Sequence, residues 1–202
     1  VDGSSFLYRA FYALKPMLSA SGAHVGAVYG FCRMIKKIID TFNPQYLALV
    51  WDSKGPTERH AIYEHYKETR QAAPMHLFEQ KSIIQDFAGQ IHLPQIEMSG
   101  YEADDLLYSV ARDFSSKGYK VVLITTDKDL AQAVNDDIVL YDSFKQETLD
   151  ISAIESRYGF SIKKLPFYFA LTGDSSDNIP GVRGIGPKGA TDLVKQFDSL
   201  QD

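Results

Sequence analysis

The sequence predicts a doubly wound α/β fold with a mainly parallel sheet and helices on both faces, and two observations lead to this prediction. Three short, continuous apolar runs lie at residues 46–51, 121–124 and 138–141. Strands that helices bury on both faces have this character. Amphipathic helical patterns lie between the runs, and an alternation of strand and helix is typical of a doubly wound domain with right-handed connections.

The helices are predicted from apolar residues that recur at steps of three and four. Residues 28–42 form the clearest such stripe, with Phe31, Ile35 and Phe42 on it. Residues 106–114 repeat the pattern, and residues 83–87 indicate a further helix. One side of each helix is therefore expected to face the core. Val1 indicates the end of one more strand, and we expect the sequence to be a piece of a longer chain.

Composition and charge restrict the class of protein. The 202 residues, 45% of them hydrophobic, suffice for one α/β core and a small appendage. No apolar run has the length of a membrane span, so no membrane partner is expected. The single cysteine, Cys32, allows no internal disulfide, which favours the reducing cytosol. A net charge of −5 argues against a nucleic-acid partner, unless a cluster of carboxylates accounts for it.

Carboxylates occur where the expected strands end and a helix begins. Ligands of α/β folds bind beyond the carboxyl ends of the strands, and Asp2, Asp52 and Asp127 fall at such ends. The whole candidate cluster contains Asp2, Asp52, Glu102, Asp104, Asp105, Asp127, Asp129, Asp174 and Asp177. Without these side chains the rest of the sequence carries a net positive charge, which suits a DNA-binding surface around the cluster.

Such a cluster predicts divalent metal ions. Carboxylates at close range raise one another's pKa and oppose folding unless cations lie between them. Ligation by oxygen alone suits Mg²⁺ or Mn²⁺ better than zinc. Two such ions about 4 Å apart activate water and stabilise the leaving oxygen of a phosphoryl displacement, which is nuclease chemistry. Taken singly, each aspartate is more often a helix cap or a turn residue.

Two polar segments are expected to lie apart from the core. Residues 53–76 have a weakly amphipathic helical pattern and carry Arg59, Lys67 and Arg70. Residues 181–189 are rich in glycine and precede a short helix at 190–197. Glycines that admit a close partner, a helix N-terminus and Lys188 together suit a DNA phosphate that is bound without reading of the base sequence. A loop with turn glycines is the alternative interpretation.

Several motifs together resemble those of the 5′-nuclease family, which is also called flap endonuclease-like. They are Val1-Asp-Gly-Ser-Ser5, Tyr8-Arg-Ala-Phe-Tyr-Ala-Leu14, Trp51-Asp-Ser-Lys54 with Arg59, Tyr66-Lys67 with Arg70, Gly100-Tyr-Glu-Ala-Asp-Asp-Leu106, Thr126-Asp-Lys-Asp-Leu130 and Leu171-Thr-Gly-Asp-Ser-Ser-Asp-Asn-Ile-Pro-Gly-Val-Arg-Gly-Ile-Gly186. They occur in the family's order and span nearly the whole sequence. The resemblance is greatest to the 5′→3′ exonuclease domain of bacterial DNA polymerase I.

The resemblance implies a PIN-like catalytic domain at residues 1–171, with a helical arch at about 53–76. Residues 172–202 would be the truncated start of a helix–three-turn–helix DNA-binding region. The carboxylates would hold two or three Mg²⁺ or Mn²⁺ ions. Asp2, Asp52, Glu102, Asp104 and Asp105 would serve mainly the first ion, and Asp127, Asp129, Asp174 and Asp177 mainly the second. Arg59, Lys67 and Arg70 match arch residues that contact the scissile phosphate, and Arg9 matches a basic residue near the active site.

The implied activity is that of a 5′→3′ exonuclease and 5′-flap endonuclease that leaves a 5′-phosphate and a 3′-hydroxyl. Its partners would be DNA with a 5′ flap, nick or junction and RNA primers paired with DNA, in the bacterial cytosol. Gly181, Val182, Gly184, Ile185, Gly186 and Lys188 match the element that grips the duplex and in relatives holds a monovalent cation such as K⁺. We expect a monomer. The alternatives are a non-catalytic DNA-junction binding module and a PIN-type ribonuclease.

Overall fold

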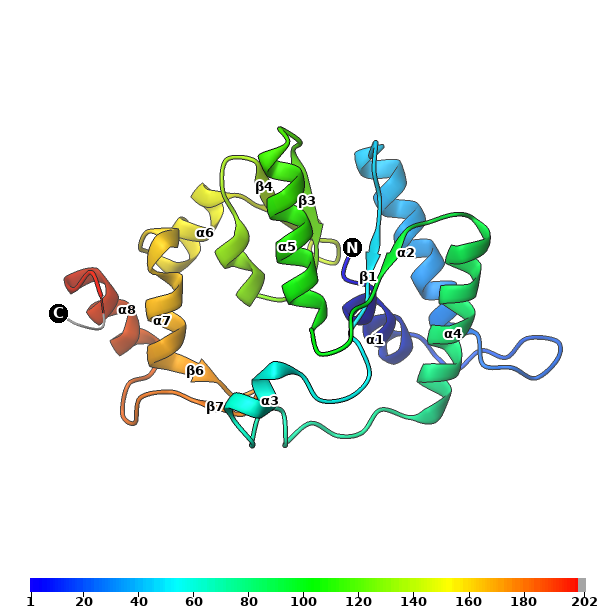
Figure 1. Cartoon of the computed structure of the whole chain (residues 1–202), viewed down its shortest axis with the longest axis horizontal. Coiled ribbons are helices and arrows are strands. Elements are labelled where there is room, and N and C mark those ends of the chain that lie inside the picture. Colours follow the sequence, from blue (N-terminus) through cyan, green and yellow to red (C-terminus); the bar gives the residue numbers. More distant parts are fainter. Residues whose placement is uncertain (200–202) are drawn as a thin grey trace.

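A computed structural model describes residues 1–199 and shows helices on both sides of short strands (Figure 1). The α-helices are α1 (Gly3–Ala13), α2 (Gly26–Phe42), α3 (Glu58–Ile62), α4 (Met75–Gln90), α5 (Ala103–Ser116), α6 (Ile151–Tyr158), α7 (Leu165–Thr172) and α8 (Pro187–Gln196). The strands are β1 (Leu49–Val50), β2 (Gln95–Ile96), β3 (Val121–Ile124), β4 (Ile138–Asp142), β5 (Glu147–Leu149), β6 (Gly173–Asp174) and β7 (Ile179–Pro180), and η1 (Asp129–Ala133) and η2 (Ile162–Lys164) are 3₁₀ helices. The predicted mixed α/β class is confirmed, while residues 200–202 of the predicted DNA-binding region lie outside the described residues.

The first two residues join two small sheets. β1 pairs with β2 in parallel, and β4 pairs in parallel with β3 and in antiparallel with β5. The backbone N–H of Val50 donates to the carbonyl of Val1 at 2.9 Å, and that of Asp2 donates to the carbonyl of Ile124 at 3.0 Å. Asp2 also forms a parallel bridge with Val50, which agrees with the strand end predicted at Val1. Asp2 is thereby placed beside the carboxyl ends of β1 and β3.

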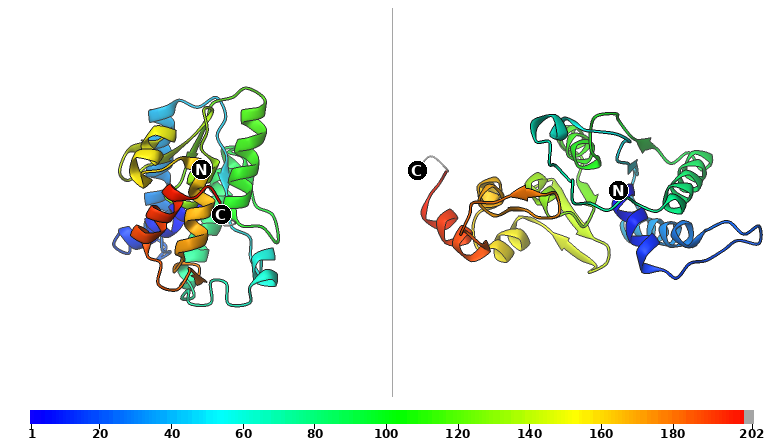
Figure 2. Two further views of the ribbon diagram at one scale, coloured as in Figure 1. Left: turned by 90° about the vertical axis from the view of Figure 1, so that its left-hand side faces the viewer. Right: turned by 90° about the horizontal axis from the view of Figure 1, so that it is seen from below.

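Helices cover both faces of these strands. Leu49 and Trp51 belong to an apolar core with side chains of α1, α2 and α4, while Val50 between them belongs to a second core with α5, α7 and α8. Leu123 and Ile124 at the end of β3 divide between the two cores in the same way. Alternate side chains of a strand point to opposite faces, so both faces are buried. Figure 2 shows α8 and the α2–α4 pair at opposite ends of the molecule.

The strand predicted at residues 46–51 is wrong in its first part, because only Leu49 and Val50 form a ladder. Leu49 is paired with Gln95, so the preceding partner in the parallel register is Pro94. Proline has no N–H to donate, and a ladder therefore cannot extend past it on that side. Tyr46 instead lies 58% exposed, with its ring against Phe114 and Tyr119.

The helices predicted at 28–42, 83–87 and 106–114 are confirmed as parts of α2, α4 and α5. The helical pattern at residues 53–76 was misleading, because only Glu58–Ile62 of this segment forms a helix before α4 begins. Lys67 has a left-handed backbone with φ of 58°, which ends any regular helix there. The segment crosses below the sheet from β1 to α4 (Figure 1). None of the described helices has both the length and the apolar character that a membrane span requires.

Candidate active site

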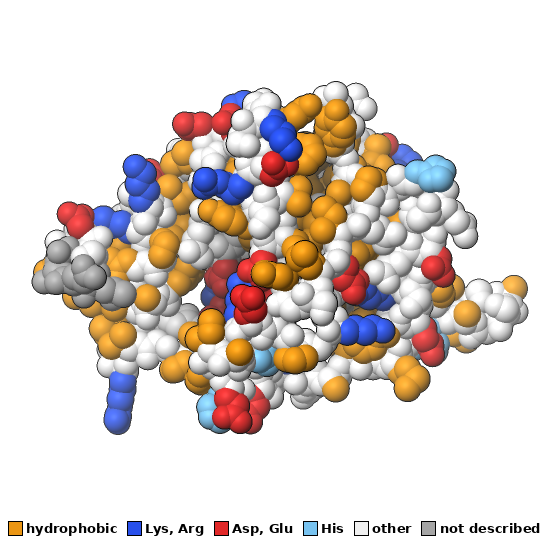
Figure 3. All heavy atoms as spheres, in the orientation of Figure 1, with side chains coloured by type: hydrophobic (Ala, Val, Ile, Leu, Met, Phe, Trp, Pro, Cys, Tyr) orange, Lys and Arg blue, Asp and Glu red, His pale blue; other side chains and the backbone are white. Residues whose placement is uncertain are grey.

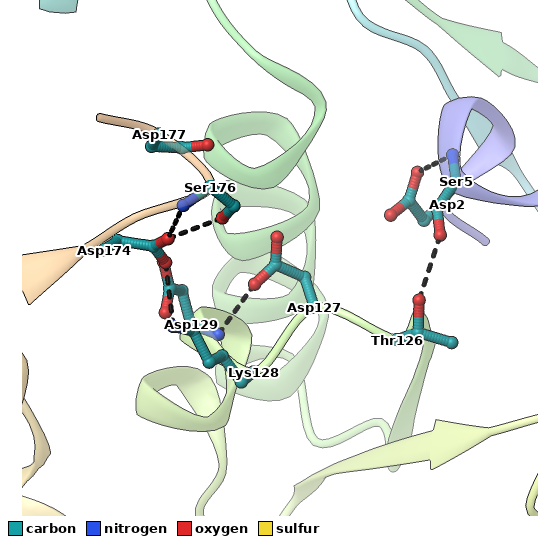
Figure 4. A pocket seen from close by; sticks show the side chains of 9 residues that line it. All are labelled: Asp2, Ser5, Thr126, Asp127, Lys128, Asp129, Asp174, Ser176 and Asp177. Atoms are coloured by element: carbon teal, nitrogen blue, oxygen red, sulfur yellow. Dashed lines mark hydrogen bonds and ion pairs between the residues drawn. The ribbon is translucent and has the colours of Figure 1, made fainter. Parts of the chain in front are cut away.

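An acidic cavity of about 310 Å³ opens at the carboxyl edge of the strands (Figure 4). Its lining consists of Asp2, Ser5, Thr126, Asp127, Lys128, Asp129, Asp174, Ser176 and Asp177. Five of the nine carboxylates predicted as metal ligands therefore lie together, although they come from three separate parts of the sequence. In Figure 4 Asp127 lies between Asp2 on one side and the group of Asp129 and Asp174 on the other.

Asp2 is fixed by the start of α1. Its carboxylate accepts from the backbone N–H of Ser5 at 2.9 Å and from the hydroxyl of Thr125 at 2.9 Å. The first bond is an N-terminal helix cap, which satisfies an otherwise free donor. Asp2 is only 5% exposed, and this burial raises its pKa to about 6. The same residue is thus both a helix cap and a side chain of the acidic cavity.

The loop that follows β3 supplies Asp127 and Asp129. The backbone N–H of Asp127 donates to the Thr125 hydroxyl at 3.1 Å, and that of Asp129 donates to the Asp127 carboxylate at 2.8 Å. These bonds turn the chain at the end of the strand and start η1. Burial, together with the charge of Asp127, raises the pKa of Asp129 to about 6. The prediction that strand-end aspartates would meet is confirmed for Asp2 and Asp127.

The hairpin of β6 and β7 supplies Asp174 and Asp177. Lys128 lies 2.8 Å from the Asp174 carboxylate, which also accepts from the backbone N–H of Ser176 at 2.7 Å. Burial disfavours ionisation of Asp174, but Lys128 and Ser176 outweigh it and lower the pKa to about 2. Asp174 therefore stays ionised over the whole physiological pH range. Lys128 was not among the predicted site residues; its position between Asp127 and Asp129 was the available signal.

The other four predicted ligands, which do not line this cavity, lie around the start of α5. Asp52 accepts from the backbone N–H of Ala103 at 2.8 Å, and Asp105 accepts from that of Glu102 at 3.0 Å. Asp104 is half-buried, and burial with the charges of Asp127, Asp2 and Asp52 raises its pKa to about 8. Because its strongest charge neighbours include residues of the cavity wall, Asp104 connects the two groups of carboxylates electrostatically.

Basic residues of the segment 53–76 lie on these carboxylates. The Arg59 guanidinium donates two hydrogen bonds of 2.7 Å to Asp105, an arrangement that lowers the pKa of Asp105. Lys67 donates to Glu102 at 2.8 Å, and Arg70 donates to Asp177.

With Lys128 on Asp174, four cations of the chain thus neutralise four carboxylates. The space-filling view shows acidic and basic side chains together at the centre of one face (Figure 3).

Tyr66 is a site residue to which the sequence motifs assigned no role. It is only 4% exposed, and its hydroxyl lies 2.9 Å from a carboxylate oxygen of Glu102 and 3.0 Å from one of Asp177. Burial and these two carboxylates raise the pKa of Tyr66, so it stays a neutral donor. It links α5 to the β6–β7 hairpin across the site. Its place in the Tyr66-Lys67 motif, which resembles that of the family, was the signal in the sequence.

The fourth predicted catalytic cation, Arg9, lies on α1 and is not part of the cavity lining. Its guanidinium carbon is 3.9 Å from the centroid of the Phe144 ring, and it forms no ion pair within residues 1–199.

The predicted duplex-binding residues at 181–188 are exposed except for the half-buried Ile185. Gly184 has φ of 86°, and Gly186 precedes the first residue of α8. A Cβ on Gly181 would lie 2.4 Å from the carbonyl oxygen of Thr172, so this glycine also has a packing role.

The donor set fits divalent cations. In residues 1–199 no three His, Cys, Asp or Glu side chains converge closely enough to hold an ion as they stand. The cavity is nevertheless lined by five carboxylates, and oxygen donors of this kind suit Mg²⁺ or Mn²⁺. The cations of the chain now lie on the same oxygens that metal ions would take. An α/β fold with five carboxylates in a cavity at its strand ends fits the class of metal-dependent nucleases.

Comparisons with known proteins identify the family. Residues 1–159 match the 5′-3′ exonuclease N-terminal resolvase-like domain, and residues 161–202 match the 5′-3′ exonuclease C-terminal SAM fold. The chain is 39% identical to a 5′-3′ exonuclease of Aquifex aeolicus over 202 residues, which are 100% of this chain and 70% of that protein. It is 38% identical to DNA polymerase I of Rhizobium leguminosarum over 99% of this chain, which is only 20% of the polymerase. The chain therefore belongs to the 5′-3′ exonuclease family.

Solved structures show the same fold. The structure of the T5 5′-exonuclease with bound zinc superposes with a TM-score of 0.80 at 20% identity, covering 100% of this chain and 75% of that one. A complex of the T5 flap endonuclease with DNA and metal ions gives a TM-score of 0.77 at 19% identity, covering the same shares of 100% and 75%. The mixed α/β arrangement of this chain is thus that of the T5 nuclease.

Proposed function

We propose that the acidic cavity is the active centre of a structure-specific 5′ nuclease. It would cut DNA at a 5′ flap, nick or junction, and RNA primers paired with DNA, leaving a 5′-phosphate and a 3′-hydroxyl. One observation carries the proposal: Asp2, Asp127, Asp129, Asp174 and Asp177 converge in one cavity, beside three basic side chains of residues 53–76. A nuclease needs both charges, since metal ions require carboxylates and the cleaved phosphate requires cations.

The proposed metal ligands fall into two sets. Asp127, Asp129, Asp174 and Asp177 line one side of the cavity and would hold one ion. Asp2, Asp52, Glu102, Asp104 and Asp105 would serve the other, directly or through water. Bound Mg²⁺ or Mn²⁺ ions, two or three in number, would supply activated water and stabilisation of the leaving oxygen. Burial and the charges of Asp127, Asp2 and Asp52 raise the pKa of Asp104 to about 8, and a cation among these carboxylates would lower it.

Residues 53–76 are proposed to act as the helical arch of the nuclease. Arg59, Lys67 and Arg70 now lie on Asp105, Glu102 and Asp177. When metal ions take these carboxylates, the three side chains are free to bind the phosphates of the strand that is cut. Tyr66 keeps its ring buried and holds its hydroxyl on Glu102 and Asp177, so it orients two proposed ligands. Arg9, about one turn beyond Ser5 on α1, would add a further cation for the DNA strand.

The segment 172–199 is proposed to bind duplex DNA as the start of a helix–three-turn–helix element, within a doubly wound, PIN-like framework. Gly181, Val182, Gly184, Ile185, Gly186 and Lys188 would contact one phosphate backbone, with K⁺ as an additional ligand. Exposure of Gly184 and Gly186 and the N-terminus of α8 support this role, because free backbone N–H groups there attract phosphate.

Cleavage of a 5′-flap DNA labelled at its 5′ end tests the proposal. The protein is incubated with Mg²⁺ or with EDTA, beside the Asp127→Ala variant. Cutting near the junction that requires Mg²⁺ and is lost in the variant supports the nuclease. Binding of the junction without cutting would instead indicate a DNA-junction binding module. Cutting of single-stranded RNA without a junction would indicate a PIN-type ribonuclease.

A further inference from the structure

Arg9 differs from the other cations of the site in having no carboxylate on it. Asp2, Ser5 and Arg9 follow one another at steps of three and four along α1, so they share one face of the helix. Asp2 and Ser5 line the acidic cavity, and Arg9 lies about one turn further along the same face of the helix. Arg9 is exposed, and within the described residues it forms no ion pair, although carboxylates line the cavity nearby.

The Arg9 guanidinium lies on the face of an aromatic ring. Its central carbon is 3.9 Å from the centroid of Phe144, within the range of a strong cation–π contact. Phe144 belongs to the turn between β4 and β5, and its ring also meets Phe6 edge-on at 6.4 Å. The buried Asp142 accepts from the backbone N–H of Phe144 at 2.9 Å and from that of Lys145 at 3.2 Å. The turn that carries the ring is thus fixed to the core.

Stacking of this kind leaves the hydrogen-bonding edge of an arginine free. A guanidinium has its N–H donors in its plane, whereas the ring contacts its face. We propose that Phe144 is a positioning residue, which holds the guanidinium of Arg9 so that its N–H groups bind a phosphate of the DNA strand. The inference rests on the proposed nuclease function and deepens it. Without the ring, Arg9 would be free to turn towards the carboxylates.

DNA affinity over a range of KCl concentrations tests this role. Fluorescence anisotropy with a 5′-flap DNA in Ca²⁺ measures binding by the intact protein and by Arg9→Ala, Phe144→Ala, Phe144→Leu and Phe144→Tyr. Arg9→Ala is expected to lower the slope of log Kd against log salt by about one, as for one lost phosphate contact. Phe144→Ala is expected to weaken binding by about two- to fivefold, the worth of one exposed cation–π contact.

The two conservative variants separate positioning from packing. Phe144→Tyr keeps an aromatic face and should bind as the intact protein does. Phe144→Leu keeps an apolar side chain against Phe6 but has no ring, and it should bind as weakly as Phe144→Ala. In the Arg9→Ala background, Phe144→Ala should cause no further loss. Circular dichroism confirms that each variant is folded.

Three results would overturn the inference: full affinity of Phe144→Leu, losses that simply add in the double variant, or an unchanged salt slope in Arg9→Ala. If the intact protein cuts the flap in Mg²⁺ and one of these results is found, this inference is refuted and the proposed function stands. If the intact protein neither binds nor cuts flap DNA, the proposed function fails together with the inference.

Discussion

Replacing Lys67 by methionine tests whether cations of the chain and metal ions compete for the same carboxylates. The Lys67 ammonium lies 2.8 Å from Glu102 and 3.7 Å from Asp177, two of the proposed metal ligands. Its side chain is 19% exposed, and those of Glu102 and Asp177 are 9% and 16% exposed, so the three charges are largely shielded from water. A divalent ion that binds these oxygens has to displace the ammonium. Methionine keeps a long side chain but cannot pair.

The size of the effect follows from the bonds that are lost. A hydrogen bond to a charged group contributes about 1.5–3 kcal/mol. Arg59, 3.8 Å from Glu102, and Arg70, on Asp177, remain in the variant and compensate part of the loss. The lower end of the range therefore applies, and the Kd for Mn²⁺ in the absence of DNA should fall about tenfold. The metal-free variant should also be less stable than the intact protein, because Glu102 loses its main partner.

Calorimetric titration with Mn²⁺ measures this affinity directly. Lys120→Met is the matched control, since Lys120 is 75% exposed and pairs with Asp137 far from the cavity. The control should bind Mn²⁺ as the intact protein does. An affinity of Lys67→Met that equals or falls below that of the control would refute the competition between Lys67 and the metal.

Further expectations concern pH, packing and the tyrosine of the site. The pKa of Asp104 is raised from 3.8 to about 8, so between these pH values the metal-free folded state holds a proton that the unfolded state has lost. The unfolding temperature of the metal-free protein should therefore fall as pH rises from about 4 to about 8. Scanning calorimetry should show a weaker dependence of the unfolding temperature on pH for Asp104→Asn. Gly181→Ala places a Cβ 2.4 Å from a carbonyl oxygen and should lower the free energy of unfolding in urea by about 1–3 kcal/mol. Gly89→Ala, with open space around it in α4, should raise this free energy by about 0.4–1 kcal/mol. Equal effects of the two glycine changes would contradict the packing argument. Tyr66→Phe removes a hydroxyl that reaches two carboxylates and should cost about 1 kcal/mol, and an unchanged denaturation midpoint would show that these bonds are not formed in solution.

Local sequence patterns predicted those features that depend on one element at a time. The apolar stripe at residues 28–42 predicts α2 correctly, because apolar residues at steps of three and four indicate a helix with one face against a core. The ends of apolar runs placed Asp2 and Asp127 correctly, since the carboxyl ends of neighbouring strands meet at one edge. The length of β1 was not predictable in this way, because Pro94 on a distant strand limits it.

The conformation of the segment 53–76 could not be predicted from its local pattern. Its Arg59 pairs with Asp105 and its Arg70 with Asp177, and these partners lie far away in the sequence. The resemblance indicated that these cations face a phosphate, and the structure places them on carboxylates instead. Both statements agree if the cations exchange partners when metal ions and DNA bind. The pairing of Lys128 with Asp174 was missed for the same reason.

The bonds of residues 1 and 2 with residues 48, 50 and 124 have a consequence for folding. Residues 1 and 2 can form these bonds only when residue 124, more than a hundred residues further along the chain, lies beside them. These are contacts of large sequence separation. Contacts of this kind slow folding, because the entropy of closing the loop is lost before they form. Val1 belongs to the core of α1, α2 and α4, so this core is not complete without it. Seating of Asp2 should therefore be a late event on the folding pathway, and nuclease activity should appear only after the whole domain has folded.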